Sequence, residues 1–253
     1  MKTTTRNTDP FRMTKLVINF NRHFFGLASL AIAIGLIIFF LVPLPPVRWA
    51  MAIGIATALY FIVGSVIASY FVYDHSDLYK LNTWPAQCFA QPPSSSILIH
   101  AGFDPASALL RQKYPGMKVR VLDFFEPSET TEASIRRAHQ LNSPTDPQEA
   151  VCSTSWPVVS HTQDAVFMLS AAHEIRDDAK RAQFFHESKR VLADNGRVVV
   201  IEQLRNLPNF LSFGFAAFHF LSRRTWLHSF IGGGLILEKE FSLSPWMRVF
   251  VLR

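Results

Sequence analysis

The sequence predicts an α/β fold with a doubly wound, mostly parallel seven-stranded sheet that ends in an antiparallel hairpin, preceded by two transmembrane helices. Three observations support this prediction. Two long apolar stretches without charged residues lie before residue 75, strand-like and helix-like segments alternate after residue 96, and the chain ends in two strands joined by a short link. We therefore divide the chain into a basic N-terminus (1–23), a helical hairpin (24–73), a juxtamembrane segment and linker (74–96) and a layered domain (97–253).

The first apolar stretch runs from Phe24 to Val42 and the second from Trp49 to Tyr73. A helix of about 20 apolar residues spans the hydrocarbon core of a bilayer, so each stretch is long enough to cross it. The link between them is rich in proline, which cannot continue a helix. The first stretch is too long for the apolar part of a signal peptide, and a second span follows at once, so we expect a retained hairpin.

Flanking charges predict the orientation of this hairpin. Basic residues before the first stretch (Lys2, Arg6, Arg12, Lys15 and Arg22) outnumber Arg48, the basic residue of the link. The positive-inside rule therefore places the N-terminus in the cytoplasm, and two crossings return the chain there. We expect an inner-membrane protein with both termini cytoplasmic, in which Leu78, Tyr79 and Leu81 lie on the membrane surface.

Composition excludes some classes of function. The chain has 253 residues and a net charge of +6, but its basic residues are scattered or flank the apolar stretches. No run of lysine and arginine interleaved with aromatic residues is present, which argues against nucleic-acid binding. Cys88 and Cys152 lie far apart, so they predict neither a disulfide framework nor a metal site.

The soluble part begins with a proline- and serine-rich linker, 91–96, and then alternates. Apolar, β-branched segments predict parallel strands at 97–100, 118–123, 150–152, 164–169 and 197–201. Helical patterns fall at 106–114, 128–141 and 177–192, and a left-handed turn is expected at Asp194–Asn195–Gly196. Strands 235–243 and 247–252 are joined by only three residues, which requires an antiparallel pair.

Candidate site residues follow the predicted strands, because ligands of such sheets bind at the carboxyl ends of the strands. They are His100, Gly102 and Asp104 after the first strand, Asp123 at the end of the second, Ser170, Ala171, His173 and Glu174 after the fourth, and Glu202 at the end of the fifth. A glycine lets a ligand approach the backbone, and a carboxylate about 20 residues later can bind ribose hydroxyls. Each residue also has a structural alternative: Gly102 turns the chain, Asp123 caps a loop, and Glu202 pairs with a nearby arginine.

The stretch from Asp164 to Arg176, followed by Phe184 to Glu202 with its "R-V-L-x-x-x-G" turn, resembles the class I S-adenosylmethionine-dependent methyltransferases. The resemblance covers about residues 95–253, including the terminal hairpin. It implies S-adenosylmethionine as cofactor, with Gly102 beneath its methionine part, Asp123 on its ribose, Ser153 and Thr154 near its adenine, and Ser170 and Ala171 lining its far side.

The first loop departs from the family pattern of an acidic residue followed by spaced glycines, because His100 replaces the acid and Asp104 the second glycine. His173, Glu174 and His219 are the candidate bases, although surface or core roles are open for each. The phenylalanine-rich segment 207–221 is too short to span a bilayer, so it is either a core helix or an apolar cap over a lipophilic acceptor.

These features together predict a membrane-anchored methyltransferase that acts on a lipophilic small molecule at the cytoplasmic face. A non-catalytic, methyltransferase-like scaffold that docks a membrane partner is the alternative. A nicotinamide-dependent oxidoreductase fits the early strands, but the glycine fingerprint of that class is missing and the terminal hairpin does not suit it.

Overall fold

The computed structural model describes residues 9–128, 133–141 and 147–253, which fall into two compact units, Met1–Ser76 and Asp77–Arg253. Lys2 and Arg6, which contribute to the predicted orientation, lie outside the described residues, as do positions 129–132 of the predicted helix 128–141.

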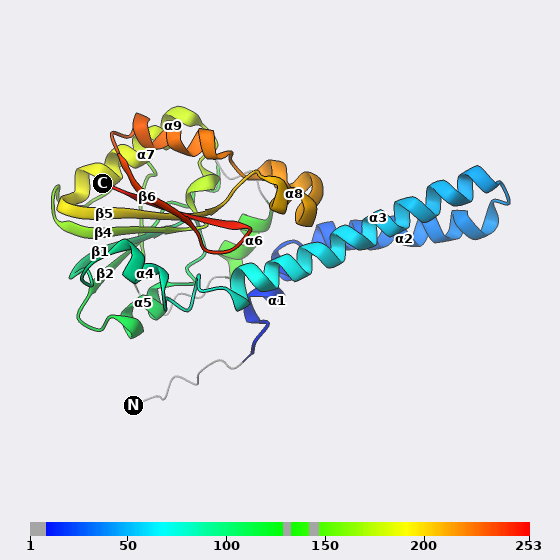
Figure 1. Cartoon of the computed structure of the whole chain (residues 1–253), viewed down its shortest axis with the longest axis horizontal. Coiled ribbons are helices and arrows are strands. Elements are labelled where there is room, and N and C mark those ends of the chain that lie inside the picture. The colour runs from blue at the N-terminus through cyan, green and yellow to red at the C-terminus, as the bar shows by residue number, and fades with distance from the viewer. Residues whose placement is uncertain (1–8, 129–132, 142–146) are drawn as a thin grey trace. The chain divides into compact units, whose positions relative to one another are not determined.

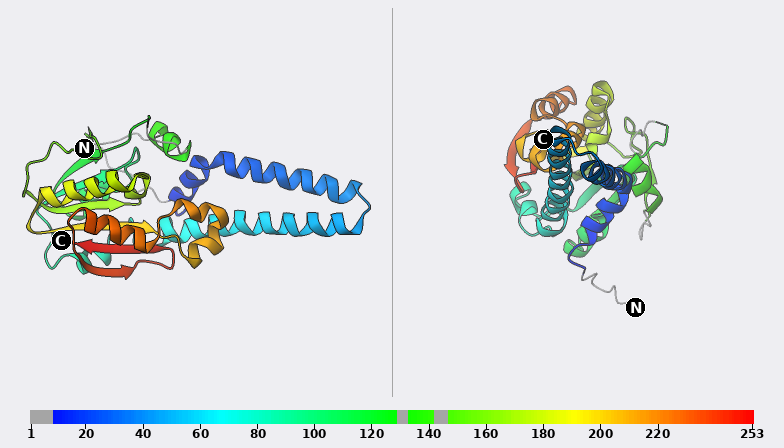
Figure 2. Two further views of the ribbon diagram at one scale, coloured as in Figure 1. Left: turned by 90° about the horizontal axis from the view of Figure 1, so that it is seen from above. Right: turned by 90° about the vertical axis from the view of Figure 1, so that its right-hand side faces the viewer.

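The first unit is helical. Its elements are α1 (Arg12–Phe20), α2 (Arg22–Leu41), α3 (Pro45–Ser69) and a short π-helix, η1 (Tyr70–His75). Helices α2 and α3 lie side by side as a hairpin (Figure 2), and Gly35 permits a close approach, because a Cβ there would lie 3.2 Å from Ile55. Asp74 anchors the start of α1 by accepting hydrogen bonds from the amides of Met13 (2.9 Å) and Thr14 (2.8 Å).

Two helical segments in this unit, Arg22–Leu41 and Pro45–His75, are long and apolar enough to cross a membrane, judged by length and composition. Their apolar side chains are largely unburied, in contrast to those of a core helix in a soluble protein.

The second unit contains one seven-stranded sheet in the order β3-β2-β1-β4-β5-β7-β6 (Figure 1). The strands are β1 (Ser95–His100), β2 (Lys118–Asp123), β3 (Glu149–Ala150), β4 (Gln163–Leu169), β5 (Leu192–Gln203), β6 (Leu237–Ser242) and β7 (Met247–Leu252). Strands β1 to β5 pair in parallel, whereas β7 is antiparallel to both β5 and β6. The predicted mixed sheet with its antiparallel terminal hairpin is confirmed.

Helices cover both faces of this sheet (Figure 1). The helical segments of this unit are α4 (Trp84–Cys88), α5 (Ser107–Lys113), α6 (Ala133–Leu141), η2 (Ala172–Glu174), α7 (Asp178–Val191), α8 (Leu207–Phe213), η3 (Gly214–His219) and α9 (Arg223–Gly232). Strand β4 shows the two-residue alternation of a central strand: Val166 and Met168 belong to the core cluster that contains Phe184 of α7, while Phe167 contacts Trp84 of α4 at 6.0 Å between ring centroids.

Two local predictions are wrong. Leu78 and Leu81, expected on the membrane surface, are 0% and 1% exposed and pack in the protein interior. Residues 194–196, expected as a left-handed turn, lie near the start of β5, and none of the three has a positive φ. In both segments, contacts with distant parts of the chain decide the structure, and the local sequence does not record those contacts.

Candidate functional site

Two groups of predicted residues lie at the carboxyl ends of the parallel strands. The first is the Gly102 loop, residues 100–104, which leaves β1. His100 ends β1 and Asp123 ends β2, and the two are direct neighbours in register. The Asp123 Oδ1 atom accepts hydrogen bonds from the amides of Gly102 (2.7 Å) and Phe125 (2.9 Å), so this carboxylate fixes the path of the loop. Its other oxygen, Oδ2, lies 3.9 Å from His139 Nδ1.

His100 is buried beside this carboxylate, with 3% of the residue exposed. Its Nδ1 atom lies 3.6 Å from Asp123 Oδ1, and neither ring nitrogen has a hydrogen-bond partner. Burial holds the pKa of His100 below its ordinary value, although the nearby carboxylates oppose the shift, so the ring is neutral at physiological pH. Unpartnered polar atoms in a protein interior are rare, which makes this ring a candidate to bind a ligand.

Gly102 is required by both backbone conformation and space. Its φ is +78°, and a Cβ at this position would lie 2.9 Å from His139 Cβ and 3.1 Å from Phe125 Cδ2. The Phe125 and His139 rings stack on each other with centroids 4.1 Å apart. This ring pair packs directly against the glycine, so a ligand that contacts Gly102 requires the pair to move.

The other predicted cofactor residues differ in whether their polar groups have partners within the protein. Asp104 Oδ1 accepts from the amides of Ala106 and Ser107, both at 2.9 Å, at the start of α5. Ser153 and Thr154 lie in a turn closed by a bridge between Cys152 and Ser155. Ser170 has a φ of +52° and a buried hydroxyl without a hydrogen-bond partner, which makes it a second candidate to bind a ligand.

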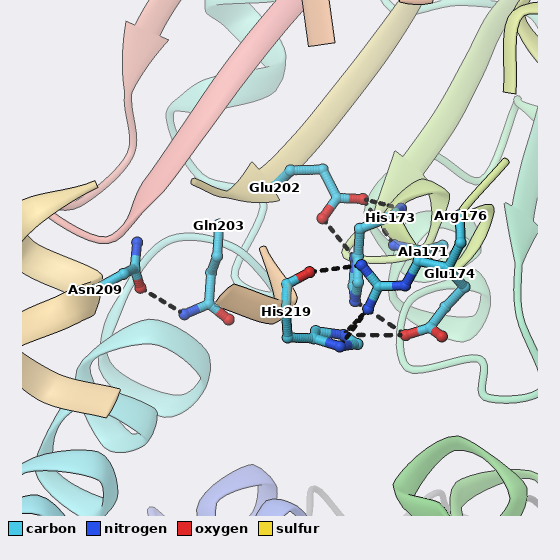
Figure 3. A network of polar contacts seen from close by, with 8 residues as sticks. All are labelled: Ala171, His173, Glu174, Arg176, Glu202, Gln203, Asn209 and His219. Atoms are coloured by element: carbon cyan, nitrogen blue, oxygen red, sulfur yellow. Dashed lines mark hydrogen bonds and ion pairs between the residues drawn. The ribbon is translucent and has the colours of Figure 1, made fainter. Parts of the chain in front are cut away.

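The second group is the His–Glu cluster, which we define as His173, Glu174, Glu202 and His219 (Figure 3). Glu202 ends β5 and is 1% exposed; its Oε1 accepts from the amides of Ala171 (3.1 Å) and His173 (3.3 Å). Its Oε2 lies 2.8 Å from His173 Nδ1, and the opposite ring nitrogen, Nε2, lies 3.0 Å from Glu174 Oε1. His219 Nε2, from η3, lies 3.6 Å from the same Glu174 oxygen. The structure therefore brings the three predicted bases together.

Charge in this cluster is balanced internally. Although burial opposes the charged form, Glu202 and Glu174 raise the pKa of His173 to about 10. Burial likewise opposes the charge on Glu174, but His173 and His219 hold the pKa of this carboxyl far below its usual range. At neutral pH, His173 is thus an imidazolium between two carboxylates and cannot accept a further proton.

Sequence reasoning missed one member of this environment. Arg176 donates from Nη1 to the main-chain oxygen of His219 (2.6 Å), and its Nη2 contacts the ring of His219. The guanidinium therefore connects the segment after β4 to η3. Glu202 was identified as a strand-end carboxylate but not as the partner that orients His173. The available signal was its position at the end of a β-branched strand. Strands β4 and β5 are parallel neighbours, so the residues that follow their carboxyl ends lie at the same edge of the sheet.

Two surface hollows among the described residues lie elsewhere. One, of about 460 Å³, is lined by residues 155–159 with Glu187 and Arg190. The other, of about 420 Å³, is an apolar hollow between α9 and the start of β6, lined by residues that include Leu227, Phe230 and Leu237. Neither is lined by residues of the Gly102 loop or the His–Glu cluster.

No protein-family model matches the chain, and no curated protein matches it. Among solved structures, the chain is similar to a putative type 11 methyltransferase from Sulfolobus solfataricus (14% identity over 68% of this chain and 89% of that one, TM-score 0.45). It is also similar to an S-adenosylmethionine-dependent methyltransferase from Leishmania major (15%, 75% and 76%, TM-score 0.48) and to one from Aquifex aeolicus (14%, 70% and 89%, TM-score 0.46).

The strand order of the sheet carries the assignment of the fold. Parallel strands β1 to β5, extended by the antiparallel pair β7 and β6, form the mixed sheet that the resemblance in sequence implied. The chain thus has the mixed seven-stranded α/β sheet that the resemblance to the class I S-adenosylmethionine-dependent methyltransferases implied.

Proposed function

We propose that this chain is an S-adenosylmethionine-dependent methyltransferase, anchored in the membrane by α2 and α3, that methylates a lipophilic small molecule at the cytoplasmic face. The observation that carries the proposal is the meeting of Gly102 and Asp123 at the ends of β1 and β2, beside the buried and unpartnered His100. In this proposal residues 97–253 carry the active site, and residues 74–96 connect them to the anchor.

The residues of the Gly102 loop suit an adenosyl cofactor. The Oδ2 atom of Asp123 is left to accept a ribose hydroxyl, because both amide hydrogen bonds go to Oδ1. His100, neutral and buried, supplies ring nitrogens towards the methionine part, and the unpartnered Ser170 hydroxyl and Ala171 line the opposite side. The cofactor, once bound, supplies an electrophilic sulfonium methyl group. Binding requires the Phe125–His139 pair to swing away from Gly102.

The His–Glu cluster forms the acceptor end of the proposed site. Its task is to hold the acceptor in line with the methyl group and to remove a proton from the attacking atom. His173 is already protonated between Glu202 and Glu174, so it acts as a hydrogen-bond donor. Of the three predicted bases, His219 is therefore left to take the proton, because its two histidine neighbours hold the pKa of Glu174 too low for that role.

The apolar character of the chain supports a lipophilic acceptor. Besides the two candidate spans, α8 and η3 expose several large apolar side chains: Leu207 (70%), Leu211 (54%), Phe215 (85%) and Phe218 (56%). These elements follow β5 and lead to His219 at the end of η3. An apolar surface next to the cluster would suit contact with a lipophilic acceptor.

Calorimetry with S-adenosylmethionine tests this proposal. We expect the purified full chain to bind the cofactor and Asp123→Ala to lose about 10-fold or more in affinity, because a charge-assisted hydrogen bond contributes about 1.5–3 kcal/mol. Asp194→Ala, which removes an exposed carboxylate elsewhere, is the matched control and should bind like the parent chain. No binding heat, or equal heat from Asp123→Ala, would contradict the proposal.

A non-catalytic scaffold is the second candidate. The Phe125–His139 pair on Gly102 favours it, because a domain that never binds a cofactor can fill the space with its own side chains. On that alternative the parent chain does not bind S-adenosylmethionine or its demethylated product, and opening the ring pair creates no binding.

A further inference from the structure

We propose that His173, Glu174 and His219 form a binding site for one divalent transition-metal ion. One ligand atom of each residue lies within 4.8 Å of the others, which is the spacing of atoms that share an ion. The ligand atoms are His173 Nε2, Glu174 Oε1 and His219 Nε2, with Nε2–Oε1 distances of 3.0 Å and 3.6 Å. Two imidazole nitrogens and one carboxylate oxygen are the donor set of three-ligand metal sites that keep positions open.

The second layer of contacts matches that of a metal site. A metal-bound histidine usually donates its other ring N–H to a carboxylate, which fixes the ring and its tautomer. His173 does so: its Nδ1 lies 2.8 Å from Glu202 Oε2, and Glu202 is itself held by two main-chain amides. This arrangement leaves Nε2 directed at Glu174 and the space between the three ligands.

Glu174 provides an independent observation. Its side chain is only 9% exposed, and its Oε1 faces both histidines, 3.0 Å from His173 Nε2 and 3.6 Å from His219 Nε2. A buried carboxylate requires a cationic partner, and a metal ion between the two rings would supply one.

The charges facing the site are those of Glu174, Glu202, the two histidines and Arg176. A divalent ion would replace the proton on His173 Nε2 and balance the two carboxylates. Arg176 opposes binding, because its Nη2 contacts the ring of His219. The guanidinium is exposed, so it can turn into solvent when the ion binds. With imidazole ligands, Zn²⁺, Mn²⁺ or Fe²⁺ is preferred over Mg²⁺ or Ca²⁺, which favour all-oxygen sites.

This inference deepens the proposed function, because an ion here would lie at the acceptor end of the site and could bind an acceptor oxygen. It does not require S-adenosylmethionine to bind. Metal titration without the cofactor, and cofactor titration of the chelator-treated protein, therefore separate a failure of one proposal from a failure of the other.

The test uses the full chain, purified in detergent without a histidine tag and treated with chelator. Titration with Zn²⁺ by calorimetry should give one tight site per chain, and Co²⁺ should give a visible d–d absorption band. His173→Ala, Glu174→Gln and His219→Ala should each weaken binding by about 100-fold, and Glu202→Gln by about 10- to 100-fold. His228→Ala, which removes an exposed histidine of α9, is the matched control and should leave the affinity unchanged.

Arg176→Gln keeps the inference falsifiable if a ligand variant fails to fold. Removal of the opposing charge should tighten Zn²⁺ binding by about 3- to 10-fold, a gain that misfolding cannot produce. The inference is overturned if the parent chain has no stoichiometric site, if His173→Ala and His219→Ala bind like the parent, or if Arg176→Gln binds no more tightly.

Discussion

Gly102 combines a conformational and a spatial constraint at one position. Its φ of +78° lies in the left-handed region, and the ring pair of Phe125 and His139 leaves no room for a Cβ. Its amide also donates to Asp123, so the loop between β1 and α5 depends on this residue. The sequence identified the glycine but not the reason for it, because the two rings come from later segments of the chain.

Replacement of Gly102 tests this constraint. We expect Gly102→Ala to lower the free energy of unfolding of the second unit by about 1–3 kcal/mol, because alanine is strained at positive φ and would clash with His139. Gly116→Ala is the matched control, since its φ is not positive and no atom lies within 4 Å of a Cβ there. Urea unfolding followed by circular dichroism measures both; equal stabilities would show that the loop adapts freely.

Cys88 and Cys152 differ in the availability of their thiolates. Burial raises the pKa of the Cys88 thiol to about 12, against a small opposing effect of Lys239, whereas Cys152 is exposed. Because only the thiolate reacts, Cys88 stays protonated and unreactive until the pH approaches 12. At pH 8, mass spectrometry should find iodoacetamide on Cys152 well before Cys88, and the difference should disappear in urea. Comparable rates in the folded protein would contradict the burial of Cys88.

At the scale of elements, α6 decides whether the Gly102 loop is accessible. The sequence predicts a helix over 128–141, and the structure describes it from Ala133 to Leu141. His139, near its end, stacks on Phe125 and covers Gly102. The amphipathic pattern predicts the helix, but the side chain that reaches the loop depends on how the helix packs beside Gly102 and Phe125.

Shortening the side chain of His139 should strengthen the binding of S-adenosylmethionine. His139→Ala removes one ring of the pair that must move, so we expect it to bind S-adenosylmethionine about 3- to 10-fold more tightly than the parent. Gln140→Ala, an exposed neighbour on α6, is the control and should not change the affinity. Calorimetry under identical conditions compares them, and weaker binding by His139→Ala would assign the ring a direct role in holding the ligand.

At the scale of the whole molecule, the chain joins a helical unit to an α/β unit. Helices α2 and α3 present apolar side chains outward along their length, which a water-exposed helix pair would not tolerate. The first unit thus contains two candidate membrane spans, and their insertion into a bilayer is part of the proposed function.

Fractionation and protease protection test this arrangement. The full chain should remain in the membrane pellet after alkaline carbonate extraction, and a C-terminal epitope should be digested in inverted vesicles but protected in right-side-out vesicles. Arginines introduced at Ile32 and Thr57, near the middle of α2 and α3, should weaken retention, since each costs about 2.5–3.5 kcal/mol at the centre of a span. Release of the parent chain by carbonate would contradict insertion, and protection in inverted vesicles would reverse the orientation.

The sequence by itself determined the elements whose signal is local. Neighbouring residues alone predict the helices of the apolar stretches and the strand of the β-branched run before Glu202. The length of the link between the last two strands alone predicts that they are antiparallel. Only the tertiary structure placed His219 against Glu174, His173 on Glu202, and His139 over Gly102. These contacts join segments far apart in the chain, and the direction of each side chain follows from packing that no local pattern records.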